Sequence, residues 1–405
     1  NVLVVDGNTY AQNSTGIQAA IDALPSGGGK IFLPAGTYSI TATVTIPSFV
    51  WLEGAGASST VLYLADSANT SVLTNEDYTN GNEYIKISNL MIDGNDAGNT
   101  GLCRGVDLRY VSNSEIDNIH VYDVEDYGLS LTHSTGYNAY NKVTNNIIES
   151  VANGVYVSYN NYSIIENNIV KNNTGRGFDI NYTSHSVISG NEAYSQGIDG
   201  IYLGYSSRNT VVNNNIRNCN GNGIELNNAD NNVVDANVLY NNDYDNDGHD
   251  HISVFESESN IVSNNRIEDT AGISDAIEVS PSTSINNVLA NNQYSGTGAE
   301  SINDQGTNTT FNQPERIALR TTATSSPVDY SAIYAIATTT GTLVDLRQTG
   351  TGDIMNLFAS TSNEIFTVLG NGNIGIGSSS PTAKLVVQGD GENIIDLQGS
   401  GSIYY

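Results

Sequence analysis

The chain has 405 residues, of which 43 are acidic and 14 are basic, so its formal net charge is −29 at neutral pH. A field of this sign repels nucleic acid and anionic membrane surfaces, and it favours neutral ligands, cationic ligands, or anionic ligands bridged by a metal. No run of 18 or more apolar residues is present, so we expect no segment to insert into a membrane.

The N-terminal segment predicts a short helix over residues 15–25. Apolar side chains recur there with helical spacing and a proline ends the pattern, at Ile17, Ala20, Ile21, Leu24 and Pro25. An open end of a stacked β-structure exposes unpaired strand edges, which a short amphipathic helix can cover. We therefore assign residues 1–60 to an N-terminal cap and the first coils.

The opening of the chain resembles that of a known superfamily. The runs IQAAIDA at 17–23, GGGKIFLPAGTY at 27–38 and LEGAG at 52–56 are similar to the start of pectate-lyase-like β-helix proteins. That group includes phage tailspikes, polygalacturonases and alginate C5-epimerases. The resemblance extends over roughly residues 1–300 and implies an all-β fold, a right-handed parallel β-helix. It implies no single reaction, because one scaffold can carry lyases, hydrolases, epimerases and inert spikes.

A five-residue phrase recurs through the middle of the chain: any residue, glycine, apolar, any residue, apolar. It starts at positions 104, 127, 153, 176, 199 and 222, and it loosens at 250 and 275. A repeat of this length is typical of a solenoid. Since alternate residues are apolar, each phrase is a short strand. Strands that repeat without helices predict a parallel β-helix, which we place at residues 61–310.

A second repeat, an apolar residue followed three positions later by asparagine, runs in step with the phrases. Asparagine tolerates left-handed backbone angles and bonds to nearby main chain, so it suits a repeated corner. We interpret these asparagines as structural and stacked along the axis. They are Asn146, Asn168, Asn191, Asn215, Asn237, Asn265 and Asn292.

The two cysteines, Cys103 and Cys219, each precede a phrase, and these phrases are five coils apart. At a strand spacing of about 4.8 Å the two residues lie on the order of 24 Å from each other. A disulfide needs Cα atoms within about 7 Å. We therefore predict two buried thiols and no bridge.

The fourth residue of each phrase is expected to point outward. Together these residues form a surface column: Asp107, Ser130, Tyr156, Asp179, Tyr202, Glu225, Ser253 and Glu278. Asp179 and Glu225 are two coils apart, about 9.6 Å by strand spacing. Two carboxyl groups roughly 6.5–9.5 Å apart suit an inverting glycosidase, which places a water between them. We take this pair as candidate catalytic residues.

The side chains around the pair are candidates for sugar contact. Aromatic rings pack on the apolar faces of sugars while the tyrosine hydroxyl stays hydrated, which favours Tyr156 and Tyr202. Arg176 and Asp199 flank the column and complete a candidate glycan cleft. The alternative is that these outward residues are merely solvated, and acidic because the whole chain is acidic.

A degraded catalytic motif gives a different hypothesis. The alginate epimerase and lyase group carries Tyr-Gly-Phe-Asp-Pro-His-Glu, in which Tyr and His handle the proton at sugar C5. The aligned stretch here starts at Tyr127 and reads YGLSLTH, with Ser130 and Thr132 at the Asp and His positions. His133 comes one residue late, which in a strand turns it to the other face. The resemblance implies Tyr127 with His133, or with His120, as an acid–base pair.

The longest insertion contains the acidic run DYDNDGHDH, residues 243–251. Asp-x-Asp-x-Asp-Gly is the first half of a calcium loop, with oxygen ligands at alternate positions and glycine at the turn. The bidentate Glu of such loops is absent, since position 254 is valine. Alternatives are a solvated acidic loop or a transition-metal site that uses the two histidines. The calcium ligands that the pattern predicts are Asp243, Asp245, Asp247 and Asp250.

Residues 311–405 differ from the coils. Two similar stretches start at Leu343 and Leu385, and GNGNIGIGSSSP at 370–381 lies between their starts. The latter resembles a Gly-Asn-x-Gly-Ile-Gly-Thr-x-x-Pro module of trimeric tail fibres and bacterial surface fibres. These strands have too little apolar content for a monomeric core, which three intertwined chains would supply. We expect a fibre-like β stalk, in a homotrimer or filament, that ends within a repeat.

Two functions fit these patterns. One is an extracellular or phage-borne fibre protein whose β-helix binds a polysaccharide or cell-surface glycan and, if active, acts as a hydrolase or lyase. The other is a non-catalytic structural or adhesive filament subunit. Few lysines and 24 tyrosines against 7 phenylalanines are typical of an extracellular β-rich protein.

Overall fold

The computed structural model describes residues 1–133, 139–244, 248–270, 275–296, 302–312, 353–360 and 363–389. The chain divides into two compact units, Asn1–Ala318 and Leu319–Tyr405. In the described residues the only helical elements are α1 (Ser14–Asp22) and a single 3-10 turn, η1 (Asp96–Gly98). The predicted all-β class, with one short N-terminal helix, is confirmed.

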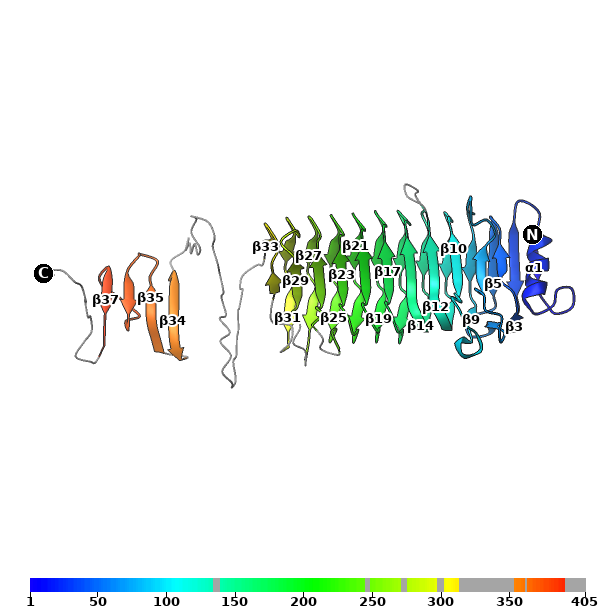
Figure 1. Cartoon of the computed structure of the whole chain (residues 1–405). Coiled ribbons are helices and arrows are strands. Elements are labelled where there is room, and N and C mark those ends of the chain that lie inside the picture. Colours follow the sequence, from blue (N-terminus) through cyan, green and yellow to red (C-terminus); the bar gives the residue numbers. More distant parts are fainter. Residues whose placement is uncertain are drawn as a thin grey trace. The chain divides into compact units, whose positions relative to one another are not determined.

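The first unit is a parallel solenoid in which most coils contribute three short strands (Figure 1). Successive coils pair in parallel, so equivalent strands form three ladders along the axis, which we call faces A, B and C. Face A consists of β1 (Val2–Val4), β2 (Gly29–Leu33), β5 (Val50–Gly54), β8 (Lys86–Ser88), β11 (Glu115–Asp117), β13 (Lys142–Thr144), β15 (Ile164–Glu166), β18 (Val187–Ser189), β21 (Thr210–Val212), β24 (Val233–Asp235), β27 (Ile261–Ser263), β30 (Val288–Ala290) and β33 (Thr310–Asn312).

Faces B and C share two long strands, β12 (His120–Thr132) and β14 (Ile147–Ser158), whose first parts belong to B and last parts to C. The other strands of face B are β3 (Gly36–Ile40), β6 (Thr60–Leu64), β9 (Met91–Asp93), β16 (Ile169–Lys171), β19 (Glu192–Tyr194), β22 (Asn215–Arg217), β25 (Val238–Tyr240), β28 (Arg266–Glu268) and β31 (Gln293–Ser295). Those of face C are β4 (Val44–Ile46), β7 (Leu73–Asn75), β10 (Val106–Arg109), β17 (Phe178–Asn181), β20 (Ile201–Gly204), β23 (Ile224–Asn227), β26 (Ile252–Phe255), β29 (Ile277–Ser280) and β32 (Ile302–Asp304).

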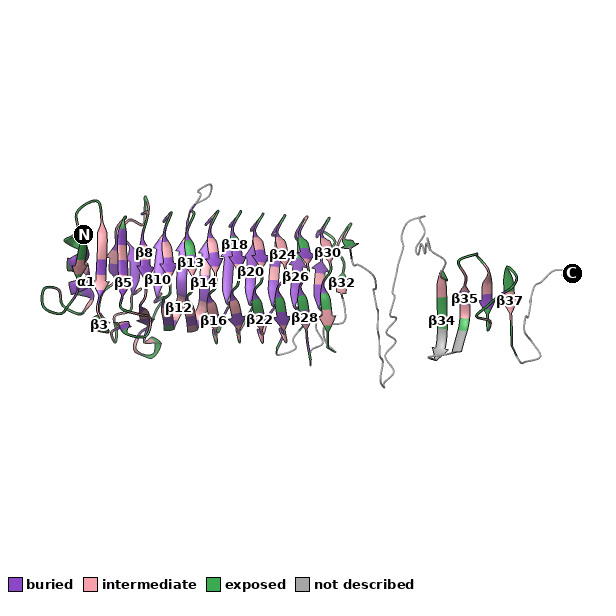
Figure 2. Cartoon of the chain, turned by 180° about the vertical axis from the view of Figure 1, so that it is seen from behind, coloured by how far each residue is buried: buried purple, intermediate pink, exposed green. Residues whose placement is uncertain are grey.

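The core is the interior enclosed by the three faces (Figure 2). The apolar residues of each phrase point inward, as Val106 and Leu108 do, and both are fully buried. Cys103 and Cys219 also lie in this core and are free thiols, which confirms the prediction of no bridge.

Helix α1 lies at the N-terminal end of the solenoid (Figure 1). The side chain of Asn13 accepts a hydrogen bond from the backbone N–H of Gly16, which caps the helix start. The helix buries Ile17 and Ile21 in the core, as its spacing predicted. It ends at Asp22, three residues earlier than the sequence indicated.

A ladder of buried asparagines runs along the solenoid beside the apolar core. The amide of each member donates to the amide oxygen of the member one coil further on, for example Asn168 to Asn191 at 3.0 Å. Two details of the prediction were wrong. The member on the β21–β22 turn is Asn214 rather than Asn215, because Val211 is the inward residue there. The left-handed backbone falls one position before the ladder, for instance at Asn167, with φ 57°.

The described part of the second unit is a four-stranded sheet made of β34 (Met355–Ser360), β35 (Asn363–Val368), β36 (Ile374–Ile376) and β37 (Leu385–Val387). The first three strands are antiparallel neighbours, and β37 pairs with β36 in parallel. Leu357, Ile365, Ile376 and Leu385 leave 44–56% of their surface exposed. Across all described residues, no helix is long and apolar enough to cross a membrane.

We expect Asn214→Ala to lower the free energy of unfolding by about 1–3 kcal/mol, because the substitution leaves the buried hydrogen-bonding partners of Asn214 unpaired. The side chain of Asn214 donates to Ile188 O and Asn237 Oδ1, and it accepts from Asn191, all within the core. Urea unfolding followed by circular dichroism measures the change. Asn215→Ala is the matched control because the neighbouring side chain is exposed. Equal losses in the two variants would contradict the role of the ladder.

Candidate functional site

The outer side of face C carries three columns of polar side chains, which we call the site face. The middle column contains the predicted residues in unbroken register, from Asp107 opposite Ser130 through to Ser253 opposite Glu278. The first column consists of Arg104, Tyr127, Asn153, Arg176, Asp199, Asn222, Asp250 and Asp275. The third column consists of Arg109, Thr132, Ser158, Asn181, Gly204, Asn227, Phe255 and Ser280.

The middle column is less exposed than the sequence predicted. Asp107 keeps only 2% of its surface, and Asp179 keeps 8%. Neighbouring side chains cover Asp107. Its carboxylate accepts hydrogen bonds from Arg104 of the first column at 3.1 Å and from Arg109 of the third column at 2.9 Å. The hydroxyl of Tyr78, which lies outside the columns, donates to Asp107 Oδ2 at 3.2 Å. These three partners were missed because the sequence argument considered flanking residues only around Asp179 and Glu225.

Arg176 contacts three other predicted residues at the centre of the site face. Its Nε donates to Asp199 Oδ2 at 2.9 Å, and its Nη1 lies 3.6 Å from Asp179 Oδ1. Its guanidinium carbon is 3.6 Å from the ring centre of Tyr202, in the stacked position of a cation–π contact. The arginine thus fixes the tyrosine ring between two buried carboxylates.

The predicted carboxyl pair is held by amide side chains. Asp179 accepts from Asn181 at 2.6 Å, and Glu225 accepts from Asn227 at 2.9 Å. The register places Tyr202 beside both of them, so the pair is two coils apart. Burial raises the pKa of Asp179 despite the nearby Arg176. Burial, followed by the charge of Asp199, also raises the pKa of Glu225.

Two tyrosines extend the site face toward the N-terminal coils. The rings of Tyr127 and Tyr156 stack with centroids 4.8 Å apart, and Arg104 lies over the ring of Tyr127 at 4.9 Å. Tyr156 is directly opposite Asp179 in the ladder. Burial and the charge of Asp179 raise the pKa of Tyr127. Tyr156 therefore adjoins Asp179, and Tyr127 lies one coil further from it.

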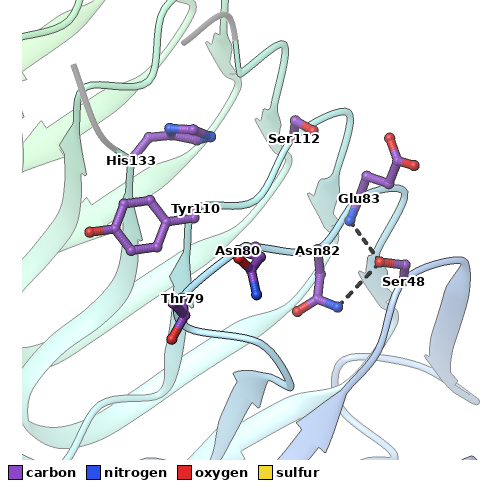
Figure 3. A pocket seen from close by; sticks show the side chains of 9 residues that line it. Ser48, Thr79, Asn80, Asn82, Glu83, Tyr110, Ser112 and His133 are labelled. Atoms are coloured by element: carbon purple, nitrogen blue, oxygen red, sulfur yellow. Dashed lines mark hydrogen bonds between the residues drawn. The ribbon is translucent and has the colours of Figure 1, made fainter. Parts of the chain in front are cut away.

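His133 lies apart from this group. It follows the end of β12, six residues after Tyr127, which corresponds to about 20 Å along an extended strand. There it packs edge-on against Tyr110 with ring centroids 5.8 Å apart, at the rim of a hollow of about 630 Å³ (Figure 3). His120 is on face B, where it contacts Glu149 at 2.8 Å. The structure does not bring either histidine to Tyr127.

The predicted calcium ligands are only partly described. Asp245 and Asp247 lie outside the described residues, while Asp243 and Asp250 are both buried. Asp250 accepts a hydrogen bond from the backbone N–H of Asp275 at 3.1 Å. Burial, together with the carboxyls of Glu278 and Asp275, raises the pKa of Asp250 to about 8. Within the described ranges, no three His, Cys, Asp or Glu side chains are grouped as a metal site.

A model of the "right handed beta helix region" matches residues 54–192, 136–247 and 181–314. These overlapping segments cover more than half of the 405 residues. The chain belongs to the right-handed β-helix family. This confirms the superfamily that the opening sequence and the repeated phrase indicated.

Several β-helix proteins are similar to this chain in sequence. Mannuronan C5-epimerase AlgE5 of Azotobacter vinelandii is 28% identical over 214 residues, which cover 47% of this chain and 21% of the epimerase. Alginate lyase 7 of the same organism is 28% identical over 206 residues, or 45% and 23% of the two chains. The preneck appendage protein of Bacillus phage PZA is 30% identical over 129 residues, or 30% and 15%. The matched region thus spans less than a quarter of each relative.

Solved structures share the β-helix fold at lower identity. The A-module of mannuronan C-5 epimerase AlgE4 from Azotobacter vinelandii superposes with a TM-score of 0.62 at 19% identity, over 77% of this chain and all of the module. DFA-IIIase from Arthrobacter chlorophenolicus A6, in complex with GF2, gives 0.60 at 13% identity, over 76% and 92%. At these identities the comparison supports the fold alone.

We predict that Asp250→Asn stabilises the protein at neutral pH. Between the ordinary pKa of 3.8 and the folded value of about 8, the folded chain retains a proton that the unfolded chain has lost. In this window the free energy of unfolding therefore falls as pH rises. The asparagine variant lacks this fall, so its advantage over the wild type grows toward pH 8.

Urea midpoints across the pH range, measured in a chelator, test this prediction. One pKa unit corresponds to about 1.4 kcal/mol, so even part of the shift is measurable. Glu258→Gln, an exposed carboxyl on a nearby turn, serves as the control. Parallel pH curves for wild type and Asp250→Asn would refute the buried, protonated carboxyl.

Proposed function

We propose that the chain binds a polysaccharide along the site face and hydrolyses it with Asp179 and Glu225. The observation that carries the proposal is this pair of carboxyls with raised pKa, a buried Asp179 and a half-buried Glu225, two coils apart on either side of Tyr202. Two strand spacings give about 9.6 Å between the coils. A carboxyl separation of this order suits the inverting mechanism, in which a water occupies the gap.

The contacts favour distinct roles for the two carboxyls. Asp179 lies next to the guanidinium of Arg176, which favours its ionised form and suits a general base that activates water. Burial and the charge of Asp199 raise the pKa of Glu225 against the opposing effect of the amide hydrogen bonds from Asn222 and Asn227, and this rise favours its protonated form. It suits a general acid that protonates the leaving oxygen. The Tyr127–Tyr156 stack offers a surface for a neighbouring sugar, whereas Tyr202 is itself buried, with 9% of its surface exposed.

The charges of the site face favour a neutral glycan. Its three columns hold three arginines, Arg104, Arg109 and Arg176, and each already contacts a carboxylate. Against them stand three carboxyls of the first column and four of the middle column: Asp199, Asp250, Asp275, Asp107, Asp179, Glu225 and Glu278. A polyuronate would bring further negative charge into this surface. A neutral polysaccharide avoids that repulsion.

The wider setting that we propose is extracellular or virion-borne, as a glycan-binding fibre. The proteins similar in sequence include a mannuronan C5-epimerase, an alginate lyase and a phage appendage protein. The exposed apolar residues of the second unit support assembly through that unit into a homotrimer or filament. A non-catalytic adhesive filament remains the alternative function. The reactivity of Asp179 and Glu225 distinguishes the two.

We expect Asp179→Asn and Glu225→Gln each to lower the hydrolysis rate by about 10²–10⁴-fold while the protein still binds glycan. A panel of soluble neutral polysaccharides, with reducing ends as the readout, measures the rate. Proton NMR of the first product should show the inverted anomer. Glu166→Gln, on face A, is the control carboxyl. Full activity in both site variants, or a retained anomer, would overturn the assignment.

Calcium at residues 243–250 remains part of the proposal. An ion bound only by the folded chain raises its melting temperature in proportion to the logarithm of its concentration. We expect calcium, but not magnesium, to raise the melting temperature of the wild type, and Asp243→Asn to weaken this response. Asp230→Asn, on a different turn, is the control. A melting temperature that does not respond to calcium would remove the site.

A further inference from the structure

The corner between faces C and A carries two columns of aromatic side chains, which we call the aromatic edge. The first column follows the last residue of face C strands and contains Tyr110, His133, Tyr159, Tyr182 and Tyr205. The second column contains Tyr140, Tyr162 and His185. Each of these residues lies two positions before a face A strand, namely β13, β15 or β18. Nothing in the proposed hydrolysis on the site face uses these rings.

In each column, three rings on successive coils are stacked, whereas Tyr110 and His133 meet edge-on. In the first column Tyr182 lies 4.7 Å from Tyr159 and 5.0 Å from Tyr205, with the ring planes 8° and 6° apart. In the second column Tyr162 lies 5.3 Å from Tyr140 and 4.9 Å from His185. The stacks cover both ring faces of Tyr162 and Tyr182, so the exposed surface of these two residues lies mainly at the ring rims.

The backbone at this corner disfavours aromatic residues. Tyr159, Tyr182 and Tyr205 have φ of 55°, 48° and 50°, in the left-handed region that bulky residues rarely adopt. The next coil has Asn228 at the equivalent position with φ 51°. Asparagine adopts this conformation at lower cost. The turn therefore does not require tyrosine, and the rings need another explanation.

The rings are also well exposed. Tyr140, Tyr162, Tyr182 and Tyr205 leave 41–55% of their surface accessible. Each stack repeats once per coil, so the exposed rims form a continuous strip rather than scattered residues. A contiguous aromatic patch on the surface of an acidic, polar protein is typical of a binding surface.

The strip leads to the hollow of about 630 Å³ beside His133 and Tyr110, the first members of the first column (Figure 3). The rest of its lining consists mostly of uncharged hydrogen-bonding groups, including Thr79, Asn80 and Ser112. Hydroxyl and amide groups next to aromatic rings suit the alternating polar and apolar surfaces of a sugar.

We propose that the aromatic edge and its hollow form a second glycan-binding site, separate from the site face, that holds a neutral polysaccharide chain along the solenoid. One ring per coil gives a repeat close to the length of one sugar unit in an extended chain. The phenol hydroxyls exchange hydrogen bonds with sugar hydroxyls, and the hollow holds the end of the chain. The inference takes only its ligand class, a neutral glycan, from the proposed function.

The test replaces the rings by the residue that the next coil already uses. Tyr182→Asn with Tyr205→Asn should reduce affinity for a long neutral polysaccharide by about thirtyfold, because each of the two ring contacts contributes on the order of 1 kcal/mol. Affinity electrophoresis in gels that contain neutral β-glucan, mannan or fructan measures the binding. The melting temperature should stay equal or rise, since asparagine relieves the left-handed backbone. Tyr122→Asn, an exposed ring on face B, is the matched control.

Three results would overturn the site. One is a lower melting temperature of the Tyr182→Asn, Tyr205→Asn variant with unchanged retention of polysaccharide, which would show that the ring stacks serve only stability. Another is an equal loss of retention in Tyr122→Asn. A third is a change in solution mass, which makes the edge an interface between copies of the chain.

Hydrolysis of a short oligosaccharide separates this inference from the proposed function. Such a substrate fills only the site face, so the edge variant should cleave it at the wild-type rate. If the edge variant loses polysaccharide retention and neither it nor the wild type cleaves any glycan, the result supports the glycan site on the aromatic edge and refutes the proposed hydrolysis. Cleavage abolished by Glu225→Gln, with retention unaffected by the edge substitutions, supports the hydrolase and refutes the edge.

Discussion

The structure depends on one constraint: each residue of a coil lies directly beside the equivalent residue of the next coil, at the spacing of paired parallel strands. Backbone hydrogen bonds set this register, and the buried ladder from Asn146 to Asn292 locks it, since each amide must meet its neighbour or remain unpaired in the core. A shift by one residue would break every amide bond of the ladder and turn the apolar residues outward. Any side chain on the surface is therefore one member of a column.

This constraint also explains the arrangement of charge on the site face. Carboxylates on adjacent coils would lie about 4.8 Å apart and repel each other. The middle column avoids this throughout, because an uncharged residue always separates two acids, as Tyr202 separates Asp179 and Glu225. The first column breaks the pattern at Asp250 and Asp275, where burial, followed by the carboxyls of Glu278 and Asp275, raises the pKa of Asp250 to about 8. Two coils are therefore the smallest separation between acidic residues in the middle column. The same separation suits the two carboxyl groups of an inverting hydrolase.

The repeated phrase was sufficient to predict the fold, the register and the middle column, because glycine and alternating apolar residues report backbone and core directly. It could not predict burial on the site face, since the groups that cover Asp107 come from Tyr78 and from other positions of the phrase. The error between Asn214 and Asn215 arose where Val211 and Val212 both fit the apolar position. The aromatic edge was missed because it begins one residue beyond each strand. Extending the phrase by two residues would have shown tyrosine at the solenoid period in Tyr159, Tyr182 and Tyr205.

The two proposed sites are linked through single residues of the same coil. Asn181 holds the carboxylate of Asp179 on the site face, and the next residue, Tyr182, turns through a left-handed backbone onto the aromatic edge. No hinge intervenes, because both residues belong to one rigid, hydrogen-bonded coil. A polysaccharide held on the edge would therefore keep its other segments at high local concentration beside Asp179 and Glu225. Such coupling raises the apparent affinity of the site face for long polysaccharide chains, while its affinity for short oligosaccharides stays unchanged. This difference is expected of an enzyme that works on an insoluble or surface-bound glycan.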